Sequence, residues 1–348
     1  MDRMETTESS SATGLPGSAY AALMQQILDV TQGYVMLGIY LIGFFGNTLS
    51  LVVFFRLRRR EDACVQYLSC LAVSDNGVII FLGVSDWIAV GLKFLTDGAV
   101  SFNFMSHTGL TCKIQQFVSQ YFMCVSAWTI AAFSAERAFV VLHPLKRVNI
   151  TATFRRKVIC LIWFSAVTAG IHHLVLMNTI PGTPVLCYYD AEPTTAAILW
   201  LMDTILFCYA PSFLIFVSNI LILVAIFKSR KSSGRTARQT HQTSNEGRLL
   251  VSLMLVSTLF IIFVLPANTT FAYLADMQEK LTEDEALFLY YIVKFLTLVA
   301  VLNYCINFII YGCTMPEYRQ DVSKIFSGVA NCLIKTIFRQ YRNDSHSG

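Results

Sequence analysis

The sequence predicts an all-α membrane protein, a seven-transmembrane helix bundle with a short amphipathic helix after the seventh span. The chain contains seven mainly apolar runs, each long enough to cross a bilayer, since about 20 helical residues with a 1.5 Å rise span the hydrocarbon core. Only 14% of its 348 residues are charged, whereas soluble domains average about 25%. The runs are Tyr34–Phe55, Tyr67–Val90, Gln116–Leu142, Val158–Met177, Ala196–Phe227, Leu249–Leu274 and Ala286–Tyr311.

These runs divide the chain into three parts. Residues 1–33 are polar, and we predict a disordered extracellular segment. Residues 34–312 form the predicted transmembrane bundle. Residues 313–348 are predicted to form the amphipathic helix and a cytoplasmic tail.

Basic residues set the predicted orientation. If residues 1–33 lie outside, the inner loops and tail hold most Lys and Arg residues, including Arg58–Arg60 and Arg155–Lys157. Such residues concentrate on the cytoplasmic side of membrane proteins. We therefore expect a multi-pass plasma-membrane protein with its N-terminus extracellular and its C-terminus cytoplasmic.

Prolines mark changes of direction along the chain. Pro211 and Pro266 lie within the fifth and sixth runs, where proline removes a backbone donor and kinks a helix. Pro316 suits the first turn of the last helix. Apolar and basic residues follow it, as expected of a helix on the inner leaflet. Cys332 in this helix is either a lipidation site or a plain thiol.

Two of the ten cysteines lie outside the apolar runs on the predicted outer side. Cys112 opens the third span, and Cys187 lies in the loop before the fifth. An oxidising compartment favours a disulfide between them. The alternative is two unpaired thiols.

Ionisable residues within membrane spans are costly and usually functional. Asp75 lies near the middle of the second span, at a depth shared by Asn47, Ser126, Asn303 and Asn307. Oxygen ligands of this kind suit a hydrated sodium ion. The alternative is a water-filled hydrogen-bond network with a protonated carboxyl group. No cofactor is required, and sodium is the one candidate ion.

A charge pair ends the third span. Arg137 stays charged, and we expect it to pair with Glu136 and with Glu246 at the inner start of the sixth helix. A pair that joins two helices can act as a latch between two packings. The alternative is an ordinary pair at the membrane interface.

Two other protein classes fit the sequence less well. In a transporter, Asp75, Asp203 and Lys294 would form a proton path, but the chain lacks the internal repeats typical of carriers. A metal hydrolase is disfavoured because His172 and His173 are adjacent, and neighbouring residues point to different faces of a helix. We predict no enzymatic activity and no nucleic-acid partner.

The chain resembles the rhodopsin-like (class A) family of G-protein-coupled receptors over about residues 34–326. No single motif is specific, but their order and membrane depth are. The motifs are Gly46-Asn47, Leu71–Asp75, Cys112, Ala135–Ala138, His143–Leu145, Trp163, Cys187, Pro211, Phe260, Leu265-Pro266 and Asn307–Tyr311.

The resemblance implies several roles. It implies a Cys112–Cys187 disulfide, a sodium site around Asp75 and a G-protein cavity with Arg137 at its floor. It also implies an inward swing of Tyr311 on activation. The residues assigned to coupling and switching are Glu136, Arg137, Glu246, Phe260, Pro266, Asn307 and Tyr311. Implied partners are a heterotrimeric G protein and, as further candidates, arrestin and membrane lipid.

Three positions depart from the family pattern. Ala138 replaces the usual aromatic residue after Arg137. Phe308 replaces the usual proline of the seventh span and predicts a weaker kink. Val264 stands where the family commonly has a tryptophan, so Phe260 and Phe263 share its predicted role.

The upper ends of the helices suggest a peptide ligand. Ser119 stands where amine receptors of the family have an aspartate. Acidic outer loops above aromatic residues favour a cationic ligand. We expect a short amidated neuropeptide with an arginine near its end. Asp86-Trp87 and the stretch Ser126–Pro144 resemble invertebrate receptors of the FMRFamide type. The predicted ligand-binding residues are Asp86, Trp87, Gln116, Ser119, Gln120, Asp203, Phe271 and Lys294.

Two alternatives remain for this region. Asp86 and Asp203 would bind the arginine of the ligand, or Asp86 would pair internally with Lys294 or Lys93. A non-peptide ligand of a class A receptor is the alternative to a peptide.

Overall fold

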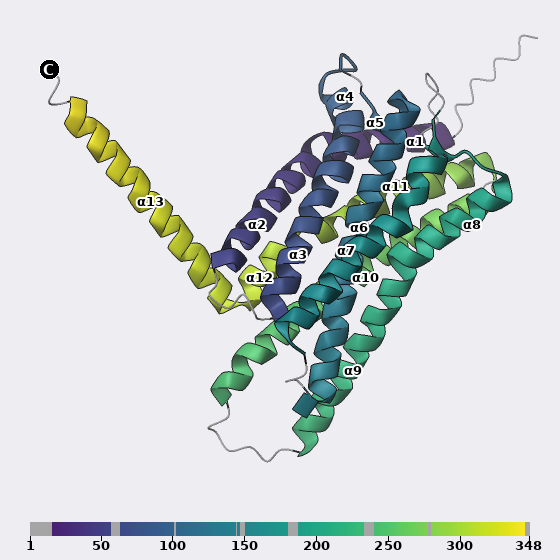
Figure 1. Ribbon diagram of the computed structural model, residues 1–348. Coiled ribbons are helices and arrows are strands. Elements are labelled where there is room, and N and C mark those ends of the chain that lie inside the picture. The colour runs from purple at the N-terminus through teal and green to yellow at the C-terminus, as the bar shows by residue number, and fades with distance from the viewer. Residues whose placement is uncertain are drawn as a thin grey trace, which may run out of the picture.

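Seven long helical segments lie together as one bundle (Figure 1). The computed structural model describes residues 16–56, 63–100, 102–143, 145–146, 150–179, 187–232, 240–277 and 280–344. Within these ranges, seven segments are long and apolar enough to cross a membrane. This confirms the predicted bundle. The structure also contains a short antiparallel strand pair, with Met177 opposite Tyr189, which the all-α prediction did not include.

The elements follow the predicted order. Several spans contain π-helical turns, labelled η. In chain order the elements are α1 (Pro16–Val30), η1 (Thr31–Met36), α2 (Leu37–Arg56), α3 (Ala63–Val78), η2 (Ile79–Val84), η3 (Trp87–Gly91), α4 (Leu92–Leu95), α5 (Phe104–His107), α6 (Gly109–Leu142), α7 (Ala152–Leu176), β1 (Met177–Asn178), β2 (Tyr188–Tyr189), α8 (Pro193–Thr204), η5 (Ile205–Tyr209), α9 (Ala210–Ser232), α10 (Thr240–Met277), α11 (Glu283–Cys305), α12 (Asn307–Thr314) and α13 (Pro316–Asp344).

The prediction of disorder over residues 1–33 is wrong for residues 16–33, which are helical and continue into α2. The physical reason is packing against the bundle. Tyr20 lies 6.2 Å from Phe288 of α11, measured between ring centroids, and Leu28 packs against a buried apolar cluster. Residues 1–15 lie outside the described ranges.

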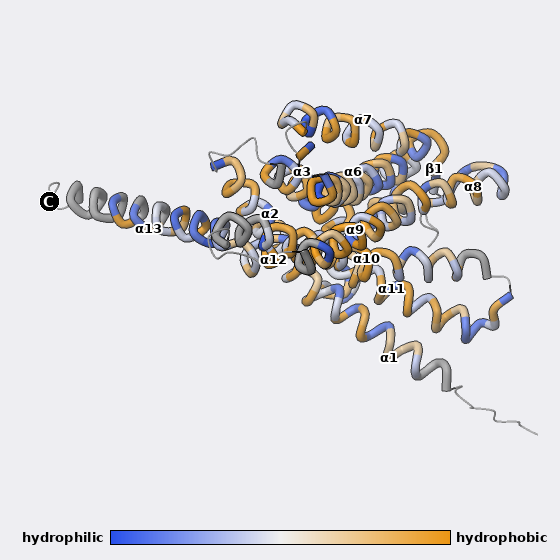
Figure 2. Tube along the Cα trace, turned by 90° about the horizontal axis from the view of Figure 1, so that it is seen from below, coloured by the Kyte–Doolittle hydropathy of each residue, from blue (hydrophilic) through white to orange (hydrophobic). Residues whose placement is uncertain are grey.

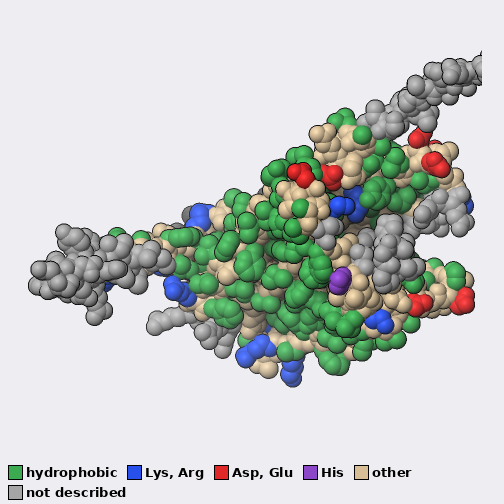
Figure 3. Space-filling view, turned by 90° about the horizontal axis from the view of Figure 1, so that it is seen from above, with side chains coloured by type: hydrophobic (Ala, Val, Ile, Leu, Met, Phe, Trp, Pro, Cys, Tyr) green, Lys and Arg blue, Asp and Glu red, His purple; other side chains and the backbone are tan. Residues whose placement is uncertain are grey.

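Helix α6 lies at the centre of the bundle and packs against α3, α7, α9 and α10. Val125 and Ala131 of α6 and Phe260 of α10 are fully buried. In contrast, Phe45 and Phe213 are more than 60% exposed on the outside. Apolar residues dominate the long helices (Figure 2) and cover most of the described surface in Figure 3. Large exposed apolar surface of this kind indicates contact with lipid.

The two ends of the bundle differ (Figure 1). One end carries the β1–β2 hairpin and the disulfide described below, and we call it the disulfide end. The opposite end carries the start of α13, and we call it the α13 end. Because α6 begins at Gly109 and ends at Leu142, its Glu136 lies at the α13 end.

The sixth and seventh spans are irregular. Pro266 lies inside α10. The seventh span is interrupted at Ile306, between α11 and α12, although Phe308 replaces the proline of the family pattern. The Phe308 ring packs against Gly46 of α2. The break in this span therefore does not need the proline.

Helix α13 runs away from the bundle at a steep angle to the long helices (Figure 1). Its 29 residues make it longer than the predicted short helix. Near its start, the buried Tyr318 lies 2.9 Å from the Ser50 hydroxyl of α2, and Arg319 donates to the carbonyl of Gly312. The side chain of Cys332 lies outside the described residues.

Candidate functional site

A disulfide joins the β1–β2 hairpin to the central helix. Cys112, in the first turn of α6, is bonded to Cys187 just before β2, and their Cα atoms are 5.6 Å apart. This confirms the predicted pair. Because Cys187 precedes Tyr188 and Tyr189, the disulfide holds the hairpin against α6 at one end of the bundle.

Asp86 belongs to the second span and interacts with residues of the first and seventh spans. Gln32 of η1 donates a hydrogen bond to its carboxylate. Lys294 of α11 acts electrostatically on Asp86, but its amine lies over the Tyr290 ring, 5.6 Å from the centroid. Among the described residues, no ion pair joins Asp86 to Lys294 or Lys93. The carboxylate therefore keeps a neutral partner.

The neighbouring predicted ligand residues have mixed surroundings. Trp87 donates to the carbonyl of Gly33, 3.1 Å away. Gln116 and Gln120 are half-buried. Phe271 is 47% exposed and lies 5.8 Å from the Trp200 ring. These residues do not converge on one cavity among those described.

Ser119 is engaged inside the protein. It is 1% exposed, and its hydroxyl donates to the carbonyl of Phe81, 3.2 Å away in η2. Gln115, one turn earlier, donates to the same carbonyl. A π-helical turn disturbs the regular hydrogen-bond ladder, and both side chains satisfy the carbonyl. Ser119 therefore has a structural role, and its contact with a ligand stays a prediction.

A polar cluster lies between α7, the hairpin and α8. The Nε2 atoms of His172 and His173 each lie 3.2 Å from a carboxylate oxygen of Asp203. Tyr189 donates its hydroxyl proton to the same carboxylate. Burial and this carboxylate raise the pKa of Tyr189, so the phenol stays protonated.

The expectation that the two adjacent histidines point apart is wrong. Their ring centroids are 4.2 Å apart. Consecutive Cα atoms differ by about 100° around a helix. Rotation about the side-chain bonds of the two histidines nevertheless brings both rings to the Asp203 carboxylate, which lies between their starting directions. Asp203, predicted to bind the ligand, is thus surrounded by three protein groups.

Asp75 joins three spans at the centre of the bundle. It is fully buried, and it accepts hydrogen bonds from Ser126 (2.7 Å) and Asn307 (2.6 Å). Asn47 donates to the carbonyl of Tyr304 at 2.9 Å, and its side-chain oxygen has no hydrogen-bond partner among the described residues.

The donor set around Asp75 fits a hydrated sodium ion. Within the described ranges, the buried amide nitrogen of Asn303 also lacks a hydrogen-bond partner. Buried polar groups are almost always satisfied by protein or ordered water. The oxygen atoms of Asp75 and Ser126 suit sodium. The same atoms also fit a water network.

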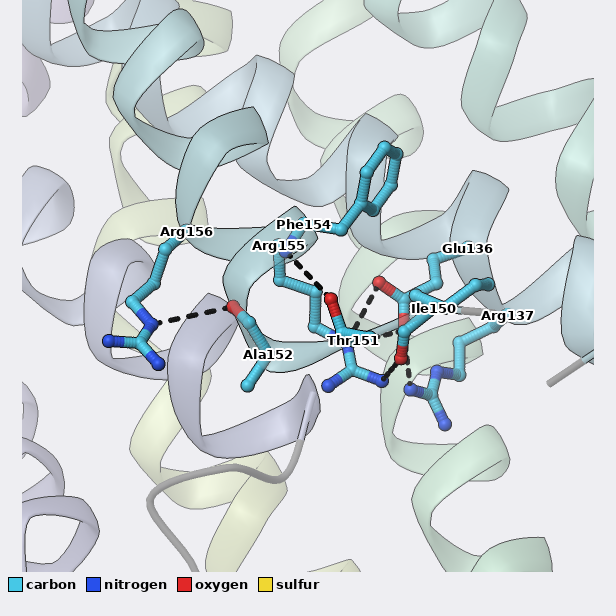
Figure 4. A network of polar contacts seen from close by, with 8 residues as sticks. All are labelled: Glu136, Arg137, Ile150, Thr151, Ala152, Phe154, Arg155 and Arg156. Atoms are coloured by element: carbon cyan, nitrogen blue, oxygen red, sulfur yellow. Dashed lines mark hydrogen bonds and ion pairs between the residues drawn. The ribbon is translucent and has the colours of Figure 1, made fainter. Parts of the chain in front are cut away.

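At the α13 end, Glu136 of α6 joins α7 and α3, and Figure 4 shows its contacts with Arg137 and Arg155. Its carboxylate lies 3.0 Å from Arg137 and 2.9 Å from the Nε atom of Arg155 in α7. Tyr67 of α3 forms a hydrogen bond with it. The Arg137 guanidinium also lies over the Phe133 ring, 5.3 Å from its centroid.

The predicted Arg137–Glu246 contact stays a prediction, because the side chain of Glu246 lies outside the described residues. A small cavity lies nearby, between α3, α6, α10 and α12. Tyr67, Phe133, Leu253 and Tyr311 are among its lining residues. The Tyr311 hydroxyl is buried and has no hydrogen-bond partner in the described part of the chain. Tyr311 therefore has space and an unmet polar group at this point.

Several of these residues were not predicted. In the sequence, Arg155 is one of many basic residues on the predicted inner side. In the structure it contacts the buried Glu136 and so bridges two helices. Gln115 lies four residues before Ser119, a spacing that places both on one face. Gln32 and Tyr189 carry no sequence signal, since their contacts depend on how the spans pack.

Comparison with known proteins identifies the family. The family described as "7 transmembrane receptor (rhodopsin family)" matches residues 46–311. The human thyrotropin-releasing hormone receptor is 24% identical over 92% of this chain and 83% of its own length. The human growth hormone secretagogue receptor type 1 is 27% identical over 82% and 78%. The neuropeptide CCHamide-1 receptor of Drosophila melanogaster is 22% identical over 68% and 48%. The chain belongs to the rhodopsin family of seven-transmembrane receptors, which are multi-pass signalling proteins of the plasma membrane that couple to G proteins and are not enzymes.

Proposed function

We propose that this receptor binds a short amidated neuropeptide at the disulfide end and activates a heterotrimeric G protein at the α13 end. Support for a peptide comes from similar receptors that are named for a hormone, a secretagogue and a neuropeptide. The finer assignment to an FMRFamide-type peptide with an arginine rests on the sequence motifs alone.

The disulfide end is the extracellular side in this proposal. Disulfides form and persist in oxidising compartments. The opposite end carries Arg137, Arg155, Arg156 and Arg319, in line with the cytoplasmic excess of basic residues. Since α1 lies at the disulfide end (Figure 1), the N-terminal segment is outside and the C-terminus inside.

The main support for this ligand site is Asp86, whose carboxylate we propose binds the cationic group of the peptide. Its carboxylate is bonded to the neutral Gln32, so its charge is available to a cationic ligand group. Trp87, Gln116, Gln120, Phe271 and Lys294 are the other candidate contacts at this end. Asp203 is omitted, because His172, His173 and Tyr189 already surround it.

Asp86→Asn tests the assignment in cells that express the receptor, with an amidated peptide library and calcium and cyclic-AMP readouts. A lost charge-assisted hydrogen bond of about 1.5–3 kcal/mol predicts about a 10- to 150-fold loss of potency. Replacing the peptide arginine by neutral citrulline should weaken the wild type but add little to Asp86→Asn. The control is Asp97→Asn, an exposed acid at the same end. Equal potency of wild type and Asp86→Asn, at matched surface expression, would refute the assignment.

Activation is a population shift between two packings. A ligand that binds the active packing better favours outward movement of the inner half of α10 below Pro266. In that packing Arg137 leaves Glu136 and faces the G protein, and Tyr311 turns into the neighbouring cavity. Phe260, fully buried in α10, would repack during this change. Arrestin would use the same end, and α13 would contact the inner lipid leaflet.

Sodium binding at Asp75 is part of the proposal. Sodium held by Asp75, Ser126 and neighbouring amide oxygens would favour the resting packing, because these groups join three spans. Raising sodium at constant ionic strength, with N-methylglucamine as the replacement ion, should lower agonist affinity in the wild type. Asp75→Asn should abolish this response. An unchanged sodium response in that variant would exclude the site and leave the water network.

A further inference from the structure

We propose that His172, His173 and Asp203 bind a divalent transition-metal ion, and that zinc suits their donor set best. Two imidazole nitrogens and one carboxylate oxygen are a ligand set found in zinc sites with an open fourth position. One ligand atom from each residue lies within 4.8 Å of the others. The cluster lies at the disulfide end, outside the residues proposed to bind the peptide or the G protein.

The separations match a coordination sphere. In a tetrahedron with metal–ligand bonds of about 2.0–2.1 Å, ligand atoms lie about 3.3–3.4 Å apart. Each Nε2 atom lies 3.2 Å from an Asp203 oxygen. Little movement is therefore needed to place an ion between the three side chains.

The hydrogen bonds of His173 favour this role. Its Nδ1 atom lies 3.0 Å from the carbonyl of Gly170 and must donate its proton there. The Nε2 lone pair then faces Asp203, which also offers only lone pairs. The Tyr189 hydroxyl lies 3.3 Å from this nitrogen, but its one proton goes to the carboxylate. Two such atoms at 3.2 Å need a proton or a metal ion between them. A metal-bound histidine commonly donates its other ring nitrogen to a backbone carbonyl in this way.

Asp203 provides a second, independent indication. Its Oδ1 atom is buried and has no hydrogen-bond partner among the described residues, although it lies 3.2 Å from His172 Nε2. The carboxylate side chain is 8% exposed and that of His173 is 1% exposed. Buried carboxylate oxygens that lack hydrogen bonds are uncommon. A metal ion would satisfy this oxygen and both imidazoles together.

The bound ion would fix the hairpin. His172 and His173 come from α7 and Asp203 from α8, while the Tyr189 hydroxyl, 3.1 Å from His172, comes from β2. A water molecule would complete the coordination, while the protonated Tyr189 keeps its hydrogen bond to the Asp203 carboxylate. Since Cys187 ties the same strand to α6, the metal would be a second, reversible fastening of the hairpin over the disulfide end.

The test uses full-length receptor in nanodiscs after chelator treatment, with Zn²⁺ alone as the probe. Binding stoichiometry and affinity are measured for the wild type, His172→Gln, His173→Gln and Asp203→Asn. The control is His107→Gln, an exposed histidine at the same end. Co²⁺, whose visible absorption reports tetrahedral coordination, is the second probe. Hydrogen exchange of residues 187–190 is followed with and without Zn²⁺.

We expect one Zn²⁺ per receptor, a tetrahedral Co²⁺ spectrum and slower exchange of the hairpin. Substitution of residues that only support metal ligands lowers affinity by up to about 100-fold, so substitution of a ligand itself should lower Zn²⁺ affinity by about 100-fold or more. The affinity of His107→Gln should stay within about twofold of the wild type. If a variant does not fold, the stoichiometry, the Co²⁺ spectrum and hairpin exchange of the wild type still decide. No Zn²⁺ binding, or binding that the three substitutions leave unchanged, would overturn the proposal and leave a proton between His173 and Asp203.

Discussion

Arg155→Gln is expected to destabilise the receptor because it removes one of the helix bridges made by Glu136. The Nε atom of Arg155 lies 2.9 and 3.2 Å from the two Glu136 oxygens, and its guanidinium also donates to the carbonyl of Ile150 at 3.2 Å. Glutamine keeps a polar side chain but cannot supply the charge. The substitution therefore tests whether α6 and α7 are held together here by the ion pair.

The size of the effect follows from burial. Exposed ion pairs contribute about 0–1 kcal/mol, and hydrogen bonds to charged groups about 1.5–3 kcal/mol. The Arg155 and Glu136 side chains are only 12% and 5% exposed. Glu136 keeps Arg137 and Tyr67 after the change, so it is not left without partners. We expect a loss of about 2 kcal/mol. This corresponds to a shift in thermal midpoint of about 4 °C or less, because about 2–4 °C per kcal/mol holds for 150–250 residues and this chain has 348.

Thermal unfolding in nanodiscs provides the assay, and the next residue provides the control. Arg156 is exposed, and within the described ranges its hydrogen bond goes only to the Ala152 carbonyl at 3.5 Å (Figure 4), so Arg156→Gln should cost less than about 0.5 kcal/mol. In a Glu136→Gln background, Arg155→Gln should cost about 1 kcal/mol less than in the wild type, because contacting residues are not additive. Equal effects of the two arginine substitutions, or full additivity with Glu136→Gln, would refute the reasoning.

Two further predictions concern the disulfide and the packing of the seventh span. Cys187→Ser opens a link across 75 residues, so chain entropy predicts a loss of up to about 4.5 kcal/mol, visible as reduced surface expression and thermal midpoint. Cys313→Ser, at an exposed free cysteine, should leave both unchanged, and a similar loss in the two variants would contradict this account. Gly46→Ala would push a methyl group into the Phe308 ring and should cost about 1–3 kcal/mol in the same unfolding assay. Gly312→Ala meets no atom within 4 Å, so no loss is expected, and a stable Gly46→Ala variant would show that the Phe308 ring can move aside.

The bundle could be predicted because its signals are local. Each span is an apolar run of sufficient length, and the charge of the loops needs no knowledge of packing. Helix α1 was not predicted because its local signal is weak. The polar composition of residues 1–33 hides the apolar residues Tyr20, Met24 and Leu28, which repeat every fourth position and become helical only because the bundle offers them a surface.

The site was predictable where the family motifs fix a residue at a given depth. Asp75 contacts Ser126 and Asn307, two of its predicted neighbours, across three spans. The contacts of Asp203 could not be foreseen, because they depend on the rotation of α7 and on a loop strand that folds back over it. The helical positions of two adjacent residues fix the directions of their Cα–Cβ bonds, but not the positions of the atoms at the ends of long side chains.

Carboxylates of neighbouring helices hold α7 at both ends. Glu136 of α6 contacts Arg155 at one end, and Asp203 of α8 contacts His172 and His173 at the other. Between them, α7 buries small residues such as Ala166, and many of its larger side chains face outward. In lipid, apolar side chains gain little by leaving hydrocarbon for another helix. Apolar contact alone therefore gives α7 a weak preference for one rotation or depth. The polar contacts at its two ends set both, together with the hydrogen bond that Trp163, between them, donates to the Cys70 sulfur of α3 at 3.0 Å.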